Sequence, residues 1–271
     1  MLDLRSINQN RFTRAKRLWT VANSCRVAAF LVGAIAALLP RPPLYIACVV
    51  FAFAVAAELF QWRSDVEKSG SEALLRKLDL CRSFNMEITE ADKRDIVWEL
   101  PRALRKRFTE SQVPDTYFTS SEPSGPRKAI ENLVESAWYT RQQSKLMLRV
   151  WIGLICVAVV FAFTALIVAS IEVSSVTARA SIGKVVTAWL LLIFSLGAIR
   201  HPWNYYKLLE RSERSYTTGS HLLRGEVTEA DAIKQWYEYQ IGRASSPLLP
   251  DWLWKRNQAD LNDAWRLTSS T

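Results

Sequence analysis

The 271-residue sequence has few of the residue types that most often hold metals or form cross-links. It contains two histidines, His201 and His221, and four cysteines with no CxxC or Cys/His spacing. Three of those cysteines fall inside apolar blocks, where a small packed thiol is the expected role. We therefore expect no metal site and no disulfide. The cysteines are Cys25, Cys48, Cys81 and Cys156.

Catalytic and cofactor-binding motifs are missing as well. The sequence has no glycine-rich phosphate loop, no GxSxG elbow and no HExxH motif. Acidic residues are numerous, with 26 Asp and Glu, but no spacing singles out a general acid and a general base. These absences favour a protein that is not an enzyme and that needs no cofactor.

Long apolar runs dominate what is present. The clearest extends from Val150 to Ile171, 22 residues without a charge, which as a helix crosses the roughly 30 Å hydrocarbon core of a bilayer. The predicted spans are residues 18–39, 44–62, 150–171 and 182–200. A proline-rich turn at 40–43 joins the first two, and a short polar loop joins the others. A signal peptide is disfavoured because the first run continues past the candidate cleavage site at 34–36.

The predicted fold class is an all-α integral membrane protein, with two transmembrane hairpins and a helical cytoplasmic region after each. The five parts are a basic N-terminus (1–17), hairpin 1 (18–62), a helical region (63–147), hairpin 2 (148–203) and a helical C-terminal region (204–271).

The distribution of positive charge predicts the orientation. The net charge of +9 would suggest a nucleic-acid partner in a soluble protein. Of the 35 basic residues, however, only Arg41, Arg179 and Lys184 need lie at the hairpin tips, and Arg26 lies within a span. The other 31 flank the opposite ends of the spans, as the positive-inside bias requires. We expect a multi-pass inner-membrane protein with cytoplasmic N- and C-termini, and no DNA or RNA partner.

Helix signals organise the polar regions. The tetrapeptide Thr-Glu-Ala-Asp occurs at 89–92 and at 228–231, and each copy predicts a helix capped by its threonine. A true internal repeat would favour a small transporter, whereas chance recurrence of good capping residues is the alternative. Nothing interrupts the helical pattern from Arg127 to Ile171, which predicts one rod entering the membrane. The segment 205–221 is expected to continue the fourth span, and a last helix begins near Asp251.

Two groups of polar residues are candidate sites. A basic cluster and a helix start could together hold a phosphorylated ligand, with Tyr117 stacking on a base; the alternative is a basic surface facing anionic lipid. The candidate ligand-binding residues are Arg102, Arg105, Lys106, Arg107, Tyr117, Ser124, Arg127 and Lys128. The candidate intramembrane polar residues are Arg26, Glu58, Thr164 and Ser195. Arg26 and Glu58 lie at matching depths, either lining a pore or forming an ion pair that reaches the interface.

Two motifs stand beside this layout: Glu135-Ser136-Ala137-Trp138-Tyr139-Thr140 before the third span, and Pro250-Asp251-Trp252-Leu253-Trp254 with Leu261, Asn262 and Trp265 in the tail. With them the chain resembles the four-helix transmembrane effectors that accompany CD-NTase enzymes in bacterial CBASS anti-phage systems. The resemblance implies an effector that answers a nucleotide signal by assembling or opening and by permeabilising the inner membrane. The partners it implies are the lipid bilayer and a cyclic oligonucleotide.

Four helices leave no room for a wide channel within one protomer, so any pore requires a homo-oligomer. The residues alone also allow a non-conducting membrane scaffold or signalling partner that recruits a cytoplasmic protein, or a small transporter.

Overall fold

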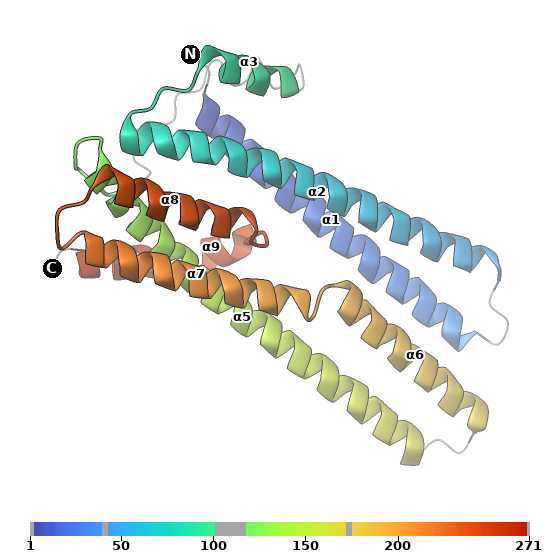
Figure 1. Cartoon of the computed structure of the whole chain (residues 1–271). Coiled ribbons are helices and arrows are strands. Elements are labelled where there is room, and N and C mark those ends of the chain that lie inside the picture. Colours follow the sequence, from blue (N-terminus) through green and yellow to red (C-terminus); the bar gives the residue numbers. More distant parts are fainter. Residues whose placement is uncertain (1–2, 40–42, 101–117, 172–174, 270–271) are drawn as a thin grey trace. The chain divides into compact units, whose positions relative to one another are not determined.

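The computed structural model describes residues 3–39, 43–100, 118–171 and 175–269. Within those ranges the regular elements are helices and no strand occurs. The helices are α1 (Leu4–Leu38), α2 (Tyr45–Phe84), α3 (Glu90–Glu99), α5 (Pro126–Ile171), α6 (Val176–Ser195), α7 (Arg200–Leu222), α8 (Glu229–Ala244) and α9 (Asp251–Ser269) (Figure 1). Four helical stretches are long and apolar enough to cross a membrane. The predicted all-α class is confirmed, and the chain is a multi-pass membrane protein.

The chain divides into two compact units. The membrane unit comprises Ala15–Asp65 and Leu146–Asn204, and the extramembrane unit comprises Met1–Arg14, Val66–Lys145 and Tyr205–Thr271. Helices α1, α2, α5 and α7 each contribute residues to both units. The segment 1–17, expected as a separate basic terminus, is largely the first part of α1, and the expected boundary at 62 lies inside α2.

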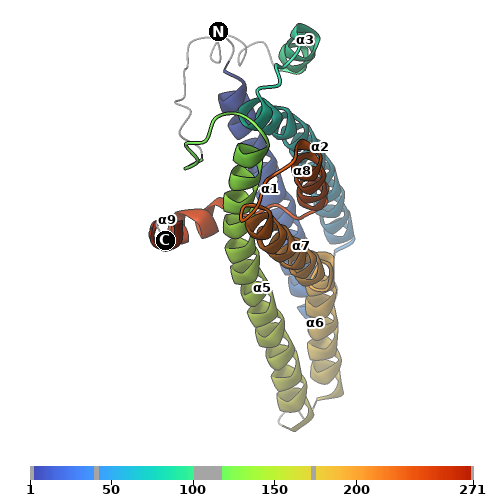
Figure 2. The ribbon, with the colours of Figure 1, turned by 60° about the vertical axis from the view of Figure 1, so that its left-hand side comes forward.

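Small residues hold the first hairpin of the membrane unit together. Ala15 and Ala22 of α1 and Ala57 of α2 are buried. The Ser64 hydroxyl of α2 donates a 2.8 Å hydrogen bond to the Ala15 carbonyl oxygen. Small side chains let two backbones approach closely, which is the common basis of helix packing in lipid. The helices therefore run side by side, as both views show (Figures 1 and 2).

Trp189 of α6 connects the second hairpin to the first within the membrane unit. Its ring centroid lies 5.5 Å from that of Phe30 in α1 and 5.5 Å from that of Phe161 in α5. The indole N–H donates a 3.4 Å hydrogen bond to the Ala158 carbonyl oxygen. A half-buried tryptophan therefore joins three spans by aromatic contact.

The helix expected at 205–221 lies within α7, but it does not continue α6 directly, because the chain turns at 196–199 between the two helices. Gly197 has φ +83°, a left-handed conformation that glycine adopts without strain. The Gly197 N–H donates to the Phe194 carbonyl (2.9 Å) and the Ala198 N–H to the Ile193 carbonyl (3.1 Å). This pair of bonds is a Schellman motif, which ends a helix. The 20 residues of α6 still span about 30 Å.

The core of the extramembrane unit is built from α1, α2, α3, α5, α7 and α8. Ile7, Leu74, Leu78 and Ile96 form one buried cluster with Leu100. An apolar stripe on α5, with members at i, i+3, i+4, i+7 and i+8, is buried throughout: Ile130, Leu133, Val134, Ala137 and Trp138. It packs on Ala232, Trp236 and Tyr239 of α8. The periodicity of 127–138 is therefore that of a core-facing helix.

Both copies of Thr-Glu-Ala-Asp cap a helix in the same way. The Thr89 side chain accepts a hydrogen bond from the Asp92 N–H, and the Thr228 side chain accepts one from the Asp231 N–H. The predicted helix starts are confirmed. Each threonine satisfies an otherwise unpaired N–H, so both copies have the capping role that chance recurrence of good capping residues requires.

Candidate functional site

At the start of α5, glutamate carboxylates lie close to the residues that were expected to bind an anion. Ser124 and Arg127 are exposed, and Lys128 is half-buried. The Arg127 Nε lies 3.8 Å from a Glu122 carboxylate oxygen and 3.6 Å from one of Glu131. A phosphate here has to compete with both acids. Arg102, Arg105, Lys106, Arg107 and Tyr117 lie outside the described residues.

The loop that leads into α5 is tied down by two other glutamate contacts. Thr119 donates to the Glu135 carboxylate from its backbone N–H (2.9 Å) and from its hydroxyl (2.7 Å). The Ser120 hydroxyl donates to Glu131 at 2.6 Å. The Gly125 N–H donates to the Ser83 carbonyl oxygen of α2 at 2.8 Å. The loop is therefore fixed to α5 and to the end of α2.

The intramembrane polar residues fall into one cluster and two isolated positions. The Arg26 Nη2 donates a 3.0 Å hydrogen bond to the Glu58 carboxylate, and its Nη1 donates to Asn23 at 2.9 Å and to Gln61 at 3.4 Å. The Arg26 side chain is 15% exposed, whereas that of Glu58 is 76% exposed. Thr164 is exposed, and the Ser195 hydroxyl donates to the Leu192 carbonyl of its own helix.

The position of the Arg26 cluster favours an ion pair near the membrane surface. Glu58 precedes Trp62 by four residues, about 6 Å along a helix. The Arg63 guanidinium lies 5.8 Å from the ring centroid of Trp62. A tryptophan beside a cation is typical of the boundary between membrane and water. The geometry places both members of the expected pair together, with the carboxylate on the outside of the protomer.

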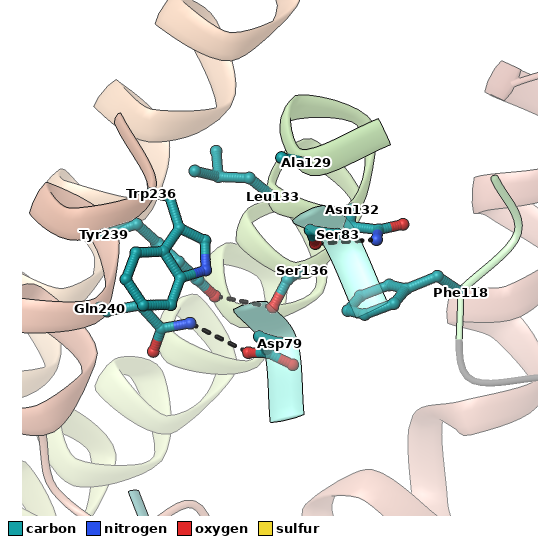
Figure 3. Close-up of a pocket in the computed structure, with 10 residues that line it drawn as sticks. All are labelled: Asp79, Ser83, Phe118, Ala129, Asn132, Leu133, Ser136, Trp236, Tyr239 and Gln240. Atoms are coloured by element: carbon teal, nitrogen blue, oxygen red, sulfur yellow. Dashed lines mark hydrogen bonds between the residues drawn. The ribbon is translucent and has the colours of Figure 1, made fainter. Parts of the chain in front are cut away.

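A second polar cluster lies in the extramembrane unit where α2, α5 and α8 meet (Figure 3). Asp79 of α2 is 7% exposed, and its Oδ2 accepts a 3.0 Å hydrogen bond from the Gln240 side-chain amide of α8. Arg82 lies 3.5 Å from the other Asp79 oxygen. Burial raises the pKa of the Asp79 carboxyl, although the charges of Arg243 and Arg82 oppose that shift.

Hydroxyl groups complete this cluster around α5. The Asn132 amide donates to the Ser83 hydroxyl at 3.3 Å. The Tyr239 hydroxyl of α8 lies 3.0 Å from that of Ser136 and 2.9 Å from that of Thr140. The polar contacts thus fasten α8 to α5 and α2 in one orientation, in addition to the apolar packing.

Three buried atoms around the cluster have no hydrogen-bond partner among the described residues: Asn132 Oδ1, Trp236 Nε1 and Gln240 Oε1. The cavity that these side chains line with Phe118 has a volume of about 10 Å³. That volume suits about one water molecule. The cavity is therefore far too small for a nucleotide.

The two motifs that carry the family resemblance pack against each other. The Tyr139 hydroxyl donates a 3.0 Å hydrogen bond to the side-chain oxygen Oδ1 of Asn262. The ring centroid of Trp265 lies 5.4 Å from that of Trp138 and 6.0 Å from that of Tyr139. The ring centroids of Trp254 and Tyr139 are 5.8 Å apart. These residues form a cluster that docks α9 onto α5, and burial raises the pKa of the Tyr139 hydroxyl.

Sequence reasoning missed the Asp79 cluster because its members are far apart in the chain. Asp79 and Gln240 are separated by 161 residues. A usable signal existed within each helix: Asp79 follows Leu75 by four residues, and Gln240 follows Trp236 by four, so each lies on an apolar stripe. A polar residue on a buried stripe is expected to find a hydrogen-bond partner.

No protein-family model, curated protein or solved structure matches this chain. Within the part of the chain that the structure describes, no group of three or more His, Cys, Asp or Glu side chains could hold a metal ion.

Proposed function

We propose that the protein is an oligomeric membrane effector that responds to a cytoplasmic signal by permeabilising the inner membrane in anti-phage defence. The observation that carries the proposal is α5, one helix of 46 residues from Pro126 to Ile171 (Figure 2). Its first part contributes to the extramembrane core, and its last part is the most apolar of the four candidate spans.

An unbroken helix provides a mechanical connection from sensor to bilayer. Ile130 and Ala137 are fully buried, so a rearrangement of the extramembrane core has to move or twist this part of α5. A hydrogen-bonded helix transmits such a displacement along its axis, because a sharp kink would require backbone hydrogen bonds to be broken. The third span is then the element that the signal displaces.

Weak packing within the membrane unit supports a rearrangement of the spans. Between 6% and 17% of the residues in the apolar window of each candidate span are buried. Most of each span therefore faces lipid or another copy. Because four helices enclose no wide channel, permeabilisation requires several copies to assemble.

The signal that we propose is a cyclic oligonucleotide, the class implied by the resemblance. Its phosphates would be received by the basic residues preceding and opening α5, including Arg127 and Lys128. Arg127 then leaves the carboxylates of Glu122 and Glu131 and binds the phosphate. The loop before α5, which Glu131 and Glu135 hold through Ser120 and Thr119, is thereby loosened. The Asp79 cavity is excluded as the binding site by its size.

The proposal is tested by dye release from vesicles containing the full-length protein. A panel of cyclic di- and trinucleotides is added, and binding is followed separately by calorimetry. We expect one compound to bind and to release dye, with release but not insertion reduced in Arg127→Ala. Absence of both binding and release across the panel contradicts the proposal. Copurification of a stoichiometric partner without release would instead favour the scaffold.

A further inference from the structure

Helix α9 is attached to the extramembrane unit along one edge. Among the side chains described on α9, Leu253, in its first turn, is the only buried one. Trp254, Leu261 and Trp265 are half-buried, whereas the charged residues of the helix are exposed. Helix α8, by contrast, buries five residues along its length. Helix α9 is therefore held more loosely than α8, and its firmest attachment lies near its beginning.

The base of α9 is fixed by the segment that leads into it. The Tyr205 hydroxyl of α7 donates a 2.7 Å hydrogen bond to the Leu248 carbonyl oxygen, and Tyr205 itself is 1% exposed. The Lys68 ammonium of α2 donates to the Ala244 carbonyl oxygen at 3.1 Å. Because these bonds and Leu253 hold the base, a movement of α9 has to begin at its far end.

The far end of α9 rests on the loop that leads into α5. The Trp265 indole N–H donates a 3.3 Å hydrogen bond to the Thr119 hydroxyl oxygen. The same hydroxyl donates to the Glu135 carboxylate at 2.7 Å, so it accepts one bond and donates another. The Thr119 backbone N–H donates to the same carboxylate oxygen at 2.9 Å. A shift of Thr119 away from Glu135 therefore removes the partner of Trp265 as well.

The docked helix covers aromatic residues of α5. Trp138 is 8% exposed, and its ring centroid lies 5.4 Å from that of Trp265. The Tyr139 hydroxyl is bonded to the Asn262 side chain. Burial of these large apolar rings favours the docked position, and lifting α9 would bring them into contact with water. Docking is therefore a balance between ring burial and the attachment of the loop.

We propose that α9 is a strap that keeps α5 in its resting position and that the loop before α5 controls its docking through Thr119. When the loop leaves Glu135, Trp265 loses its hydrogen-bond partner, the far end of α9 lifts and the aromatic residues beneath it become accessible. Such coupling is reciprocal, so whatever loosens the end of α9 also loosens the loop. The inference deepens the proposed function and rests on it, since that function has the same loop released when a phosphate binds at Arg127.

Hydrogen exchange of the full-length protein in vesicles, measured without nucleotide, tests the coupling. Thr119→Val removes the shared hydroxyl, and Trp265→Phe removes the indole N–H but keeps an aromatic ring. We expect each variant to raise amide exchange about fivefold both in α9 and in residues 118–125, the effect of one lost hydrogen bond. Trp252→Phe is the control, because Trp252 is 49% exposed on the same helix, and it should change neither segment.

The double variant shows whether the two substitutions act through one bond. Because Thr119→Val and Trp265→Phe break the same hydrogen bond, exchange of α9 in the double variant should be no faster than in Thr119→Val alone. Exchange that rises only in the substituted element, or in neither, overturns the strap. Additive effects of the two substitutions overturn it as well.

Dye release from the same vesicles separates this inference from the proposed function. Trp265→Ala, which removes the ring as well as the N–H, should release dye about tenfold faster than wild type without nucleotide, because the docked position is weakened. Trp252→Ala should not. A wild-type basal rate in Trp265→Ala, when a cyclic nucleotide does accelerate release from wild type, overturns the strap. Coupled exchange with no release from any vesicle contradicts permeabilisation only.

Discussion

The two units of this chain accommodate their apolar residues in opposite ways. In the extramembrane unit Ile7 and Ile130 are fully buried and Tyr205 is 1% exposed. In the membrane unit Val157 is 69% exposed and Phe163 is 64% exposed. Such exposure would be costly in water, but lipid tails are as apolar as the side chains themselves. Burial therefore specifies the first unit, and a few particular contacts specify the second.

Those particular contacts are polar or aromatic. The membrane unit is joined by the Ser64 hydrogen bond, the Trp189 ring contacts and the Arg26 cluster. At its end, His201 stacks on Trp151 with ring centroids 4.8 Å apart. The helices of the membrane unit are thus held together by a few contacts, whereas those of the extramembrane unit are held together by buried apolar clusters.

The largest predicted difference compares two isoleucines on the same helix, α5. Ile130→Ala should lower the free energy of unfolding by about 2–5 kcal/mol, because it leaves a cavity in the core. Ile167, 55% exposed in the membrane unit, should tolerate alanine within about 0.5 kcal/mol. Denaturation in detergent, followed by tryptophan fluorescence, measures both. Equal losses would show that the membrane unit has a core of its own.

A break in α5 should separate the two units functionally. Lys145→Pro, at the last residue that α5 contributes to the extramembrane unit, removes a helix hydrogen bond and costs about 3 kcal/mol locally. We expect signal-dependent dye release to be lost while membrane insertion is retained. Lys145→Ala is the control and should behave as wild type. Wild-type release from the proline variant would rule out α5 as the connection.

A substitution in the turn between α6 and α7 should change the free energy of unfolding by less than the Ile130 substitution does. Gly197→Ala should destabilise the protein by about 1–2 kcal/mol, because a left-handed residue acquires a Cβ. That Cβ would lie 2.7 Å from the His201 ring. Gly183→Ala in α6, where nothing lies within 4 Å, should be neutral or slightly stabilising. Thermal unfolding distinguishes them, and equal shifts would contradict the role of the turn.

The smallest effect concerns pH and Asp79. Its folded-state pKa lies above the ordinary value of 3.8, so the folded state binds the proton more tightly than the unfolded state does. The free energy of unfolding should therefore fall as pH rises from 3.8 through the folded-state pKa, and then level off. Asp79→Asn should remove that part of the slope. Denaturant unfolding across this pH range measures it, and an unchanged slope assigns the dependence to other groups.

Local rules predicted much of the fold. The four spans followed from apolar length, the start of α8 from the Thr228 cap, and the continuity of α5 from the lack of any breaker. The break at Gly197 was missed, because a single glycine in an apolar run is tolerated in many membrane helices. The Schellman bonds form only when the following residues turn back.

The candidate sites were less predictable. Arg26 and Glu58 could be paired from their equal distance to the turn, since a hairpin brings matching depths together. The Asp79 cluster and the Tyr139–Trp254–Trp265 contacts could not, because helices far apart in the chain supply the partners. Periodicity identifies a buried face but not the residue that faces it.

Local sequence was sufficient to predict the four apolar spans, the uninterrupted helix from Arg127 to Ile171 and the two capping threonines, since each depends on neighbours within a few turns. The tertiary structure decided that Trp189 lies between spans, that Asp79 is buried against Gln240, and that α8 keeps Tyr237 outward. Those outcomes depend on contacts between residues distant in the chain, whose energies no local pattern contains.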